Sequence, residues 1–247
     1  MATLTGKTAL LTGGLGTLGR AQAIKLSAEG AQVVVLDRPE SDNAEARAAA
    51  LGDSVSFFGC DLNDLENAET LVGELANKVG GFDVLINNAA LIINKPHEDF
   101  TLTEYEDQIR VNSSAAFALT RTCAASMKAK KYGKVVNFTS VTLTGQWDGY
   151  VPYVTSKGAM FGLTKSMARE LGPHGITINA VAPGAIVSEA EERVFGDKLQ
   201  EYNDWVLDRQ CLKARIQPEH VADLVHFLVS PASDMITGQN YAIDGGW

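Results

Sequence analysis

Tyr153 and Lys157 lie four residues apart in a stretch with helical periodicity, so a helix would present both side chains on one face. A phenol with a reference pKa near 10 is a poor base at neutral pH, and an ammonium a few ångström away would stabilise the phenolate. Ser140 ends an apolar run before them, and Asn112 lies in an earlier helical stretch. A Tyr/Lys pair at this spacing also occurs on ordinary helix surfaces, but these polar neighbours favour general acid–base chemistry.

A glycine-rich loop at residues 12–19 follows an apolar run and opens a helical stretch. Gly14, Gly16 and Gly19 satisfy the pattern GxGxxG. Glycines let a backbone turn tightly and approach a pyrophosphate, whose charge then lies at the helix N-terminus. Such loops also occur as plain turns, but the order of strand, loop and helix is the one that a dinucleotide-binding loop requires.

Asp37 ends the second apolar run, 18 residues after Gly19, close to the spacing expected of a ribose-binding acid. Its carboxylate would accept hydrogen bonds from the 2′-hydroxyl of NAD but would face the 2′-phosphate of NADP. Two like charges about 4 Å apart cost up to about 4 kcal/mol at an effective dielectric near 20. Arg38 would soften that penalty, so the sequence predicts a preference for NAD. An exposed acid at a strand end is the alternative.

The positioning elements alternate between short apolar strands and longer helices. The helices are expected at residues 18–30, 44–51, 64–79, 103–130, 153–171 and 218–229, and the strands at 8–12, 32–36, 55–58, 84–86, 135–138, 176–181 and 240–243. This alternation predicts one α/β domain over residues 1–247, with a doubly wound, Rossmann-like parallel sheet of about seven strands and helices on both faces. A polar helical insertion at about 188–213 is expected to cap the substrate. Ligands of such sheets bind at the carboxyl ends of the strands.

The composition excludes several classes of protein. The chain has 247 residues, a formal charge of −9 and no apolar stretch approaching the roughly 20 residues of a membrane span. Its acidity disfavours nucleic acid and anionic membrane surfaces as partners. The four histidines, His97, His174, His220 and His226, show no metal-ligand spacing, so no metal is expected.

Three cysteines far apart, without a CxxC pair, are typical of free buried thiols in a reducing compartment. They are Cys60, Cys123 and Cys211. The first residues carry no basic region followed by an apolar run, as a secretory signal would. We therefore expect a cytoplasmic protein.

Over essentially its whole length the sequence resembles the short-chain dehydrogenase/reductase family. Several motifs carry the resemblance at matching positions: the 12–19 loop, Asp61, Asn87-Asn88-Ala89-Ala90, Asn112, Ser140, Tyr153-x-x-x-Lys157, Asn179-x-x-x-Pro183-Gly184 and Gly238-Gln239 with Asp244-Gly245-Gly246. The resemblance implies hydride transfer between nicotinamide C4 and a carbinol carbon, with the protein supplying orientation and proton transfer.

By this resemblance Tyr153 is the general acid/base, and Ser140 hydrogen-bonds the reacting oxygen. Lys157 would hold the nicotinamide ribose and lower the pKa of Tyr153, and Asn112 would position a water that links Lys157 to solvent. Asp61 and Leu62 would meet the adenine, Asn88 the adjoining ribose, and Ile186 with Ser188 the carboxamide. The implied NAD-binding set is Gly13, Gly16, Thr17, Leu18, Asp37, Asp61, Leu62, Asn88, Ala89, Tyr153, Lys157, Pro183, Gly184, Ile186 and Ser188.

Two departures from the family pattern are visible. Thr17 replaces the middle glycine of the family's short-chain loop, which gives the spacing of its longer, epimerase-containing branch. A chain of 247 residues leaves no room for that branch's C-terminal substrate domain, so the short branch is the better reading. Ala90 replaces a glycine and adds one methyl group, which should be tolerated.

The residues expected to face the substrate favour a polar secondary alcohol, such as a sugar, polyol or sugar-like acid. They are residues 91–94, Thr142, Gln146, Trp147, Arg193, Trp205 and Arg209. An amide can bind hydroxyls, and an indole can cover the C–H side of a ring. Either arginine could bind an acidic substituent, or both could pair with a solvated acidic cluster at Glu189, Glu191 and Glu192. Trp205 could instead be a core anchor.

Two other functions stay open. A 3-oxoacyl thioester reductase belongs to the same branch, but Asp37 disfavours NADPH, and no basic surface for an acidic carrier is obvious. A nicotinamide-sensing regulator would have no need of a proton relay. By resemblance a homo-oligomer, most simply a tetramer, is expected, with Trp247 buried at a subunit contact.

Overall fold

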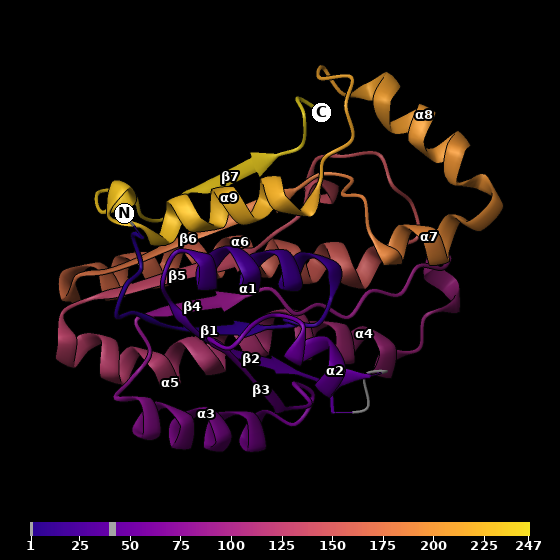
Figure 1. Cartoon of the computed structure of the whole chain (residues 1–247). Coiled ribbons are helices and arrows are strands. Elements are labelled where there is room, and N and C mark those ends of the chain that lie inside the picture. The colour runs from indigo at the N-terminus through magenta and orange to yellow at the C-terminus, as the bar shows by residue number, and fades with distance from the viewer. Residues whose placement is uncertain (1, 40–42) are drawn as a thin grey trace.

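A computed structural model describes residues 2–39 and 43–247. Its centre is one seven-stranded parallel sheet in the order β3-β2-β1-β4-β5-β6-β7 (Figure 1). The strands are β1 Thr8–Thr12, β2 Gln32–Asp37, β3 Val55–Gly59, β4 Val84–Asn87, β5 Gly133–Phe138, β6 Ile176–Pro183 and β7 Asn240–Ile243. The order reverses between β1 and β4, which confirms the expected doubly wound sheet.

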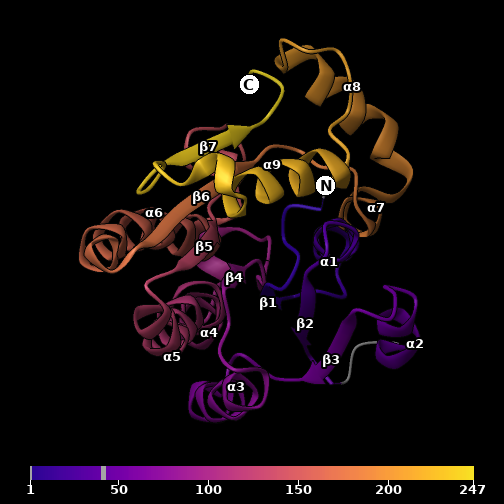
Figure 2. The same ribbon diagram turned by 60° about the vertical axis from the view of Figure 1, so that its left-hand side comes forward.

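Helices cover both faces of the sheet. They are α1 Thr17–Ala28, α2 Ala44–Ala49, α3 Leu65–Val79, α4 Leu102–Ile109, α5 Ala115–Lys130, α6 Val151–Leu171, α7 Glu189–Phe195, α8 Leu199–Arg209 and α9 Pro218–Val229. Figure 2 shows α1 and α9 on one face and α3, α5 and α6 on the other. Strand side chains alternate between the faces. Leu11 and Val35 therefore pack in the core under α1 and α9, whereas Leu10 and Val34 pack under α3 and α5.

Two expected helical stretches are divided in the structure. The stretch at 103–130 is α4 and α5, joined by a π turn at Arg110–Ser114 that holds Asn112. Single π turns inside α-helices frequently mark functional sites. The insertion at 188–213 is α7 and α8, joined by a short 3₁₀ turn. No helix among the described residues is long and apolar enough to cross a membrane.

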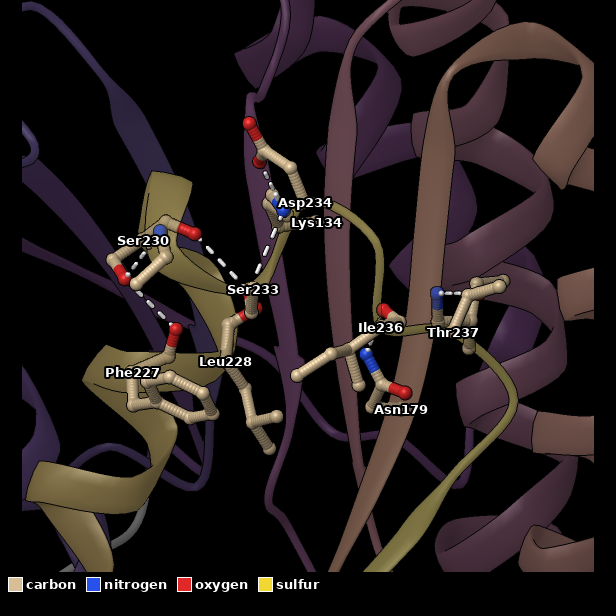
Figure 3. A network of polar contacts seen from close by, with 11 residues as sticks. Lys134, Asn179, Phe227, Leu228, Ser230, Ser233, Asp234, Ile236 and Thr237 are labelled. Carbon is tan, nitrogen blue, oxygen red and sulfur yellow. Dashed lines mark hydrogen bonds and ion pairs between the residues drawn. The ribbon is translucent and has the colours of Figure 1, made fainter.

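The connection from α9 to β7 is fixed at the amino-terminal end of the sheet by polar contacts with buried residues of β5 and β6 (Figure 3). Lys134 Nζ lies 2.7 Å from the Asp234 carboxylate, although the lysine is almost fully buried. The amide of Asn179 donates to the Ile236 carbonyl at 2.8 Å, and Thr237 Oγ1 accepts from the Ile178 N–H at 3.0 Å. Because β7 is parallel to β6, residues 244–247 then emerge at the carboxyl edge of the sheet.

Two expectations from the sequence are wrong. Cys211 is exposed, whereas Cys60 and Cys123 are buried, and burial raises the pKa of these two thiols to about 11 and about 12. The acidic start of α7 is only partly solvated. Glu191 forms an ion pair with Arg215 at 2.7 Å, and both side chains are 12% exposed. Arg215 lies 24 residues further on, so spacing along the chain gave no sign of this pair.

Candidate active site

Ser140, Thr142 and Tyr153 come together where β5 ends. Ser140 directly precedes a short 3₁₀ turn, and its Oγ accepts hydrogen bonds from the Thr142 N–H at 3.1 Å and the Thr142 hydroxyl at 2.9 Å. Tyr153 lies in the first turn of α6, and its phenol is near enough to the Ser140 hydroxyl for that group to lower its pKa. A serine hydroxyl and a phenol thus converge on one point at the carboxyl edge of the sheet.

Burial dominates the acid–base properties of Tyr153. It raises the pKa of the phenol to about 12, while contact with Ser140 acts in the opposite direction. The phenol is therefore protonated at neutral pH. The expected lowering of this pKa by Lys157 is not produced by the protein groups alone.

Lys157 is 2% exposed, and its Nζ donates to the Phe138 carbonyl at 2.9 Å, 5.3 Å from the centre of the Tyr153 ring. Burial lowers the pKa of this ammonium to about 8. The lysine is thus held by the end of β5, beside the phenol, on the helix face that its spacing predicts.

Asn112 connects the end of β4 to α6. Its Oδ1 accepts from the Leu91 N–H at 2.6 Å, and its Nδ2 donates to the Leu91 carbonyl at 2.9 Å and to Ser156 Oγ at 3.0 Å. Both amide hydrogens are therefore in use. A water held by this side chain would have to donate to Oδ1.

The glycine loop has the close packing that a dinucleotide cradle requires. A Cβ at Gly14 would lie 2.4 Å from a Val35 methyl, and one at Gly19 would lie 2.1 Å from the Gly13 carbonyl oxygen. Gly16 has room for a side chain, since its Cβ would meet only Gly13 at 3.6 Å. Gly16 is also the N-cap of α1 and offers no side chain to the first N–H groups of that helix. This end of α1 fits a pyrophosphate.

Two neighbouring side chains fix the loop to the sheet. The Asn88 amide donates to the Thr12 and Gly13 carbonyls at 3.0 and 3.1 Å, and Thr12 Oγ1 accepts from the Asn88 and Ala89 N–H groups at 3.1 Å each. Asp37 lies on the other side, where its carboxylate accepts from the Leu15 N–H at 2.9 Å. The loop is therefore held by the Asn88 amide on one flank, and on the other it has an acid that could accept from a ribose hydroxyl.

The remaining residues expected to bind the cofactor differ in burial and in their hydrogen-bond partners. Leu62, Ala89 and Asn112 line one small cavity, whereas Asp61 is exposed and accepts from the Asn63 N–H. Ile186 pairs by one bridge with Ile216. The side chain of Ser188 caps α7 by accepting from the Glu191 N–H at 3.2 Å, so binding a carboxamide would compete with this contact.

Gly184 and Pro183 end β6 beside the last residues of the chain. A Cβ at Gly184 would lie 2.8 Å from the Asp244 Cα, which explains why a glycine is needed there. The Gly184 N–H also donates to the Ile243 carbonyl at 3.0 Å. The β6–α7 connection and residues 244–247 therefore form one wall of the site.

Neither substrate-side arginine pairs with the acidic cluster as one reading of the sequence proposed. Arg193 is exposed and donates to its own helix, at the Glu189 carbonyl. Arg209 lies over the Trp205 ring, 4.2 Å from its centre. Trp205, Trp147 and Trp247 form one cluster, with the Trp147 and Trp247 rings stacked 4.5 Å apart. Gln146 is exposed beside this cluster.

Comparison with known proteins agrees with this geometry. Residues 14–247 match the family model described as enoyl-(acyl carrier protein) reductase. The chain is 33% identical to D-xylose 1-dehydrogenase of Caulobacter vibrioides over 99% of its own length and 96% of the relative's. It is 34% identical to a 3-oxoacyl-[acyl-carrier-protein] reductase of Aquifex aeolicus, over 98% of both chains.

A solved structure from Beutenbergia cavernae, described as an NAD(P)-dependent gluconate 5-dehydrogenase with NADP at low occupancy, superposes with a TM-score of 0.91. The two are 33% identical over 99% of this chain and 98% of the other. The chain belongs to the short-chain dehydrogenase/reductase family. It is thus an oxidoreductase of a family that binds a nicotinamide cofactor.

Sequence reasoning about this family member missed a set of contacts between α7 and the glycine loop. The Thr17 hydroxyl, where the family has a glycine, accepts from the Glu189 N–H at 3.3 Å. Arg20 bridges the Glu189 carboxylate at 2.6 Å and the Leu15 carbonyl at 2.7 Å, and Arg47 lies 3.6 Å from Glu189. Thr17, where the sequence departs from the family pattern, was the one signal of these contacts.

The buried ammonium of Lys157 predicts a stability gain when it is removed. The pKa of Lys157 is about 8 in the folded chain, against an ordinary value of 10.5. At neutral pH this difference lowers the free energy of unfolding by at most roughly 3 kcal/mol. Lys157→Met also leaves the Phe138 carbonyl without its hydrogen-bond donor, and this loss offsets about 1 kcal/mol of the gain in stability. We expect the variant to be inactive yet to melt several degrees higher at pH 7.

The sign of the pH dependence follows from linkage. Between pH 8 and 10.5 the unfolded wild-type chain binds more protons than the folded one at this position, so its stability rises with pH. The advantage of Lys157→Met should therefore shrink over that range. Calorimetric melting at pH 7 and pH 10 checks this, and an equal advantage at both values would contradict it.

Proposed function

We propose that this enzyme is an NAD-dependent dehydrogenase that reversibly oxidises a secondary alcohol of a sugar, polyol or sugar-acid-like substrate to the ketone; at the anomeric hydroxyl of a cyclic sugar the same hydride transfer gives the lactone. The observation that carries the proposal is the mouth of the site. Gln146 and Trp147 lie on the loop between Ser140 and Tyr153, and the Trp205 ring meets Trp147 edge-on at 5.5 Å, where a pocket for a long acyl chain would carry aliphatic groups. The similarity to D-xylose 1-dehydrogenase supports the same substrate class.

In this proposal Tyr153 and Ser140 act on the reacting oxygen. Ser140 donates a hydrogen bond to it, and Tyr153 accepts the hydroxyl proton during oxidation or returns it during reduction. NAD, when bound, supplies the hydride acceptor at nicotinamide C4. Lys157 holds the nicotinamide ribose and passes protons toward Asn112 and solvent. With a pKa near 8, Lys157 is well suited to exchange protons near neutral pH.

The cofactor is proposed to lie along the carboxyl edge of the sheet. Asp37 would accept from the 2′-hydroxyl of the adenine ribose, and the first turn of α1, with Gly13, Thr17 and Leu18, would hold the pyrophosphate. Asp61 and Leu62 would border the adenine, Asn88 and Ala89 the ribose, and Pro183, Gly184, Ile186 and Ser188 the nicotinamide. Helices α7 and α8 would cap the substrate within a single domain.

A 3-oxoacyl thioester reductase is the second candidate. The description of the matching family model and the 34% identity to a 3-oxoacyl-[acyl-carrier-protein] reductase favour it. Asp37 at the ribose position and the aromatic mouth favour the first candidate.

Substrate choice is tested by kcat/KM with NAD across a panel of alcohols. We expect D-xylose, D-glucose or D-gluconate to be oxidised more efficiently than linear alcohols such as 2-pentanol or 2-octanol. Gln146→Ala should lower kcat/KM for the best hydroxylated substrate several-fold, since one hydrogen bond is worth about 1 kcal/mol. A preference for the linear alcohols, or no response to the Gln146 change, would count against this pocket.

We further propose a cytoplasmic homotetramer. Leu102, Phe117 and Phe161 on α4, α5 and α6 are 70%, 46% and 42% exposed, and a second copy would cover them. Trp247 already packs within its own chain, so its contact with another subunit stays a prediction. Light scattering at micromolar protein should give about four times 26.4 kDa, and a monomeric mass would contradict the assembly.

A further inference from the structure

Residues 244–247 are bound to the segment that follows α8. Gly245 and Gly246 both have positive φ, at 71° and 81°. Their carbonyls accept from the Leu212 N–H at 2.9 Å and the Cys211 N–H at 3.2 Å. A Cβ at Gly245 would lie 2.5 Å from the buried amide of Gln210. The two glycines therefore let the chain pass close under the end of α8.

This turn places Trp247 against the two tryptophans of the proposed substrate mouth. Its ring stacks on Trp147, 4.5 Å between centres with 19° between planes, and lies 5.2 Å from Trp205. Trp147 belongs to the loop before α6, and Trp205 to α8. Three segments far apart in the sequence thus meet in one cluster, which contains all three tryptophans of the chain.

The chain leads from this cluster to the proposed catalytic tyrosine, since Trp147 precedes Tyr150 and Tyr153 on one segment. The Tyr150 and Tyr153 rings are 6.1 Å apart, and the Tyr202 ring stacks with the Trp205 ring, 5.9 Å between centres. Tyr202 also stacks on Phe195 and lies under Arg215, the partner of the mostly buried Glu191. The aromatic cluster therefore packs, through Tyr202, on the Arg215–Glu191 ion pair, and its Trp147 lies on the segment that leads into α6 and Tyr153.

We infer that Trp247 is a specificity-determining residue, and that with Trp147 and Trp205 it forms a wall on which the C–H face of a pyranose ring stacks. This inference rests on the proposed function. An indole face offers both a large apolar area and a negative quadrupole to the polarised C–H bonds of a sugar ring. A small acyclic diol covers little of such a wall, so its contact with Trp247 contributes little to its binding free energy.

The test compares Trp247→Ala, Trp247→Leu and Trp247→Phe with the wild type on D-xylose, D-glucose and 2,3-butanediol, with NAD saturating. We expect the alanine and leucine variants to raise KM for the better pyranose about tenfold, with kcat and the diol kcat/KM within about threefold. Phenylalanine keeps an aromatic face, so the KM of this variant for the pyranose should lie close to the wild-type value. Tyr132→Leu, at the opposite end of β5, is the matched control. It should leave KM and kcat/KM unchanged for both the pyranose and the diol.

The outcomes separate the two proposals. If the wild type oxidises no pyranose but reduces acetoacetyl-CoA, the proposed function is wrong, and this inference falls with it. If the wild type oxidises a pyranose and all three variants keep its KM, or lose pyranose and diol turnover equally, the inference alone is wrong. If Trp247→Ala fails to fold, the comparison of leucine with phenylalanine decides, because both keep apolar bulk and only one keeps the ring.

Discussion

Tyr153→Phe should lower kcat at least about 100-fold, in the range of 10²–10⁴ that general acid–base catalysis contributes. The substitution keeps the ring in its place at the start of α6 and removes the hydroxyl that is proposed to exchange a proton with the substrate beside Ser140. Ser140 alone would still hydrogen-bond the oxygen but could not accept its proton.

The measurement is the steady-state rate of NADH formation with the best substrate of the panel, together with NAD affinity. NAD affinity should barely change, because the phenol is proposed to act on the substrate oxygen. Tyr132→Phe, at the other end of the sheet, serves as the control for loss of a phenol. A Tyr153→Phe enzyme with more than a tenth of wild-type kcat, under conditions where chemistry limits the rate, would refute the assignment.

NAD should outperform NADP by about 10²-fold or more in kcat/KM, which corresponds to about 2.7 kcal/mol at 1.36 kcal/mol per decade. The reason is the Asp37 carboxylate, which stands at the end of β2 beside the glycine loop. Asp37→Ala should narrow the difference, because Arg38 would then meet the 2′-phosphate unopposed.

The hydrogen bonds of Asp37 suggest a second variant for this test. Asp37 also accepts the Leu15 N–H, so alanine both removes the charge and releases the loop. Asp37→Asn removes the charge and keeps one acceptor oxygen for the Leu15 N–H, while the second oxygen, which accepts from the Arg38 N–H at 2.8 Å, is lost. We expect asparagine to narrow the preference with less loss of NAD efficiency than alanine. Equal kcat/KM for NAD and NADP in the wild type would contradict the proposed role of Asp37 in cofactor preference.

The sheet was predictable because each strand is a short apolar run bounded by turn residues. The run Val135-Val136-Asn137-Phe138, for example, lies within β5. The π turn around Asn112 was not predictable, because one extra residue in a helical turn leaves the apolar periodicity of α4 and α5 almost unchanged. The same holds for the break between α7 and α8.

The motifs placed the candidate site along the chain, but not its contacts between distant segments. Tyr153 and Lys157 share a helix face because their spacing requires it. The pairing of Glu189 with Arg20 and the stacking of Trp247 on Trp147 join residues 169 and 100 positions apart. Such contacts depend on how α7 and residues 244–247 pack against the sheet, which no local pattern encodes.

The central claim is that this enzyme oxidises a hydroxylated substrate with NAD. Its most direct test compares kcat/KM for NADH formation from the best sugar or sugar acid of the panel with kcat/KM for NADPH-dependent reduction of acetoacetyl-CoA by the same preparation. The account predicts that the first value exceeds the second by at least tenfold. A larger value for the thioester, or no NADH from any hydroxylated substrate, would contradict it.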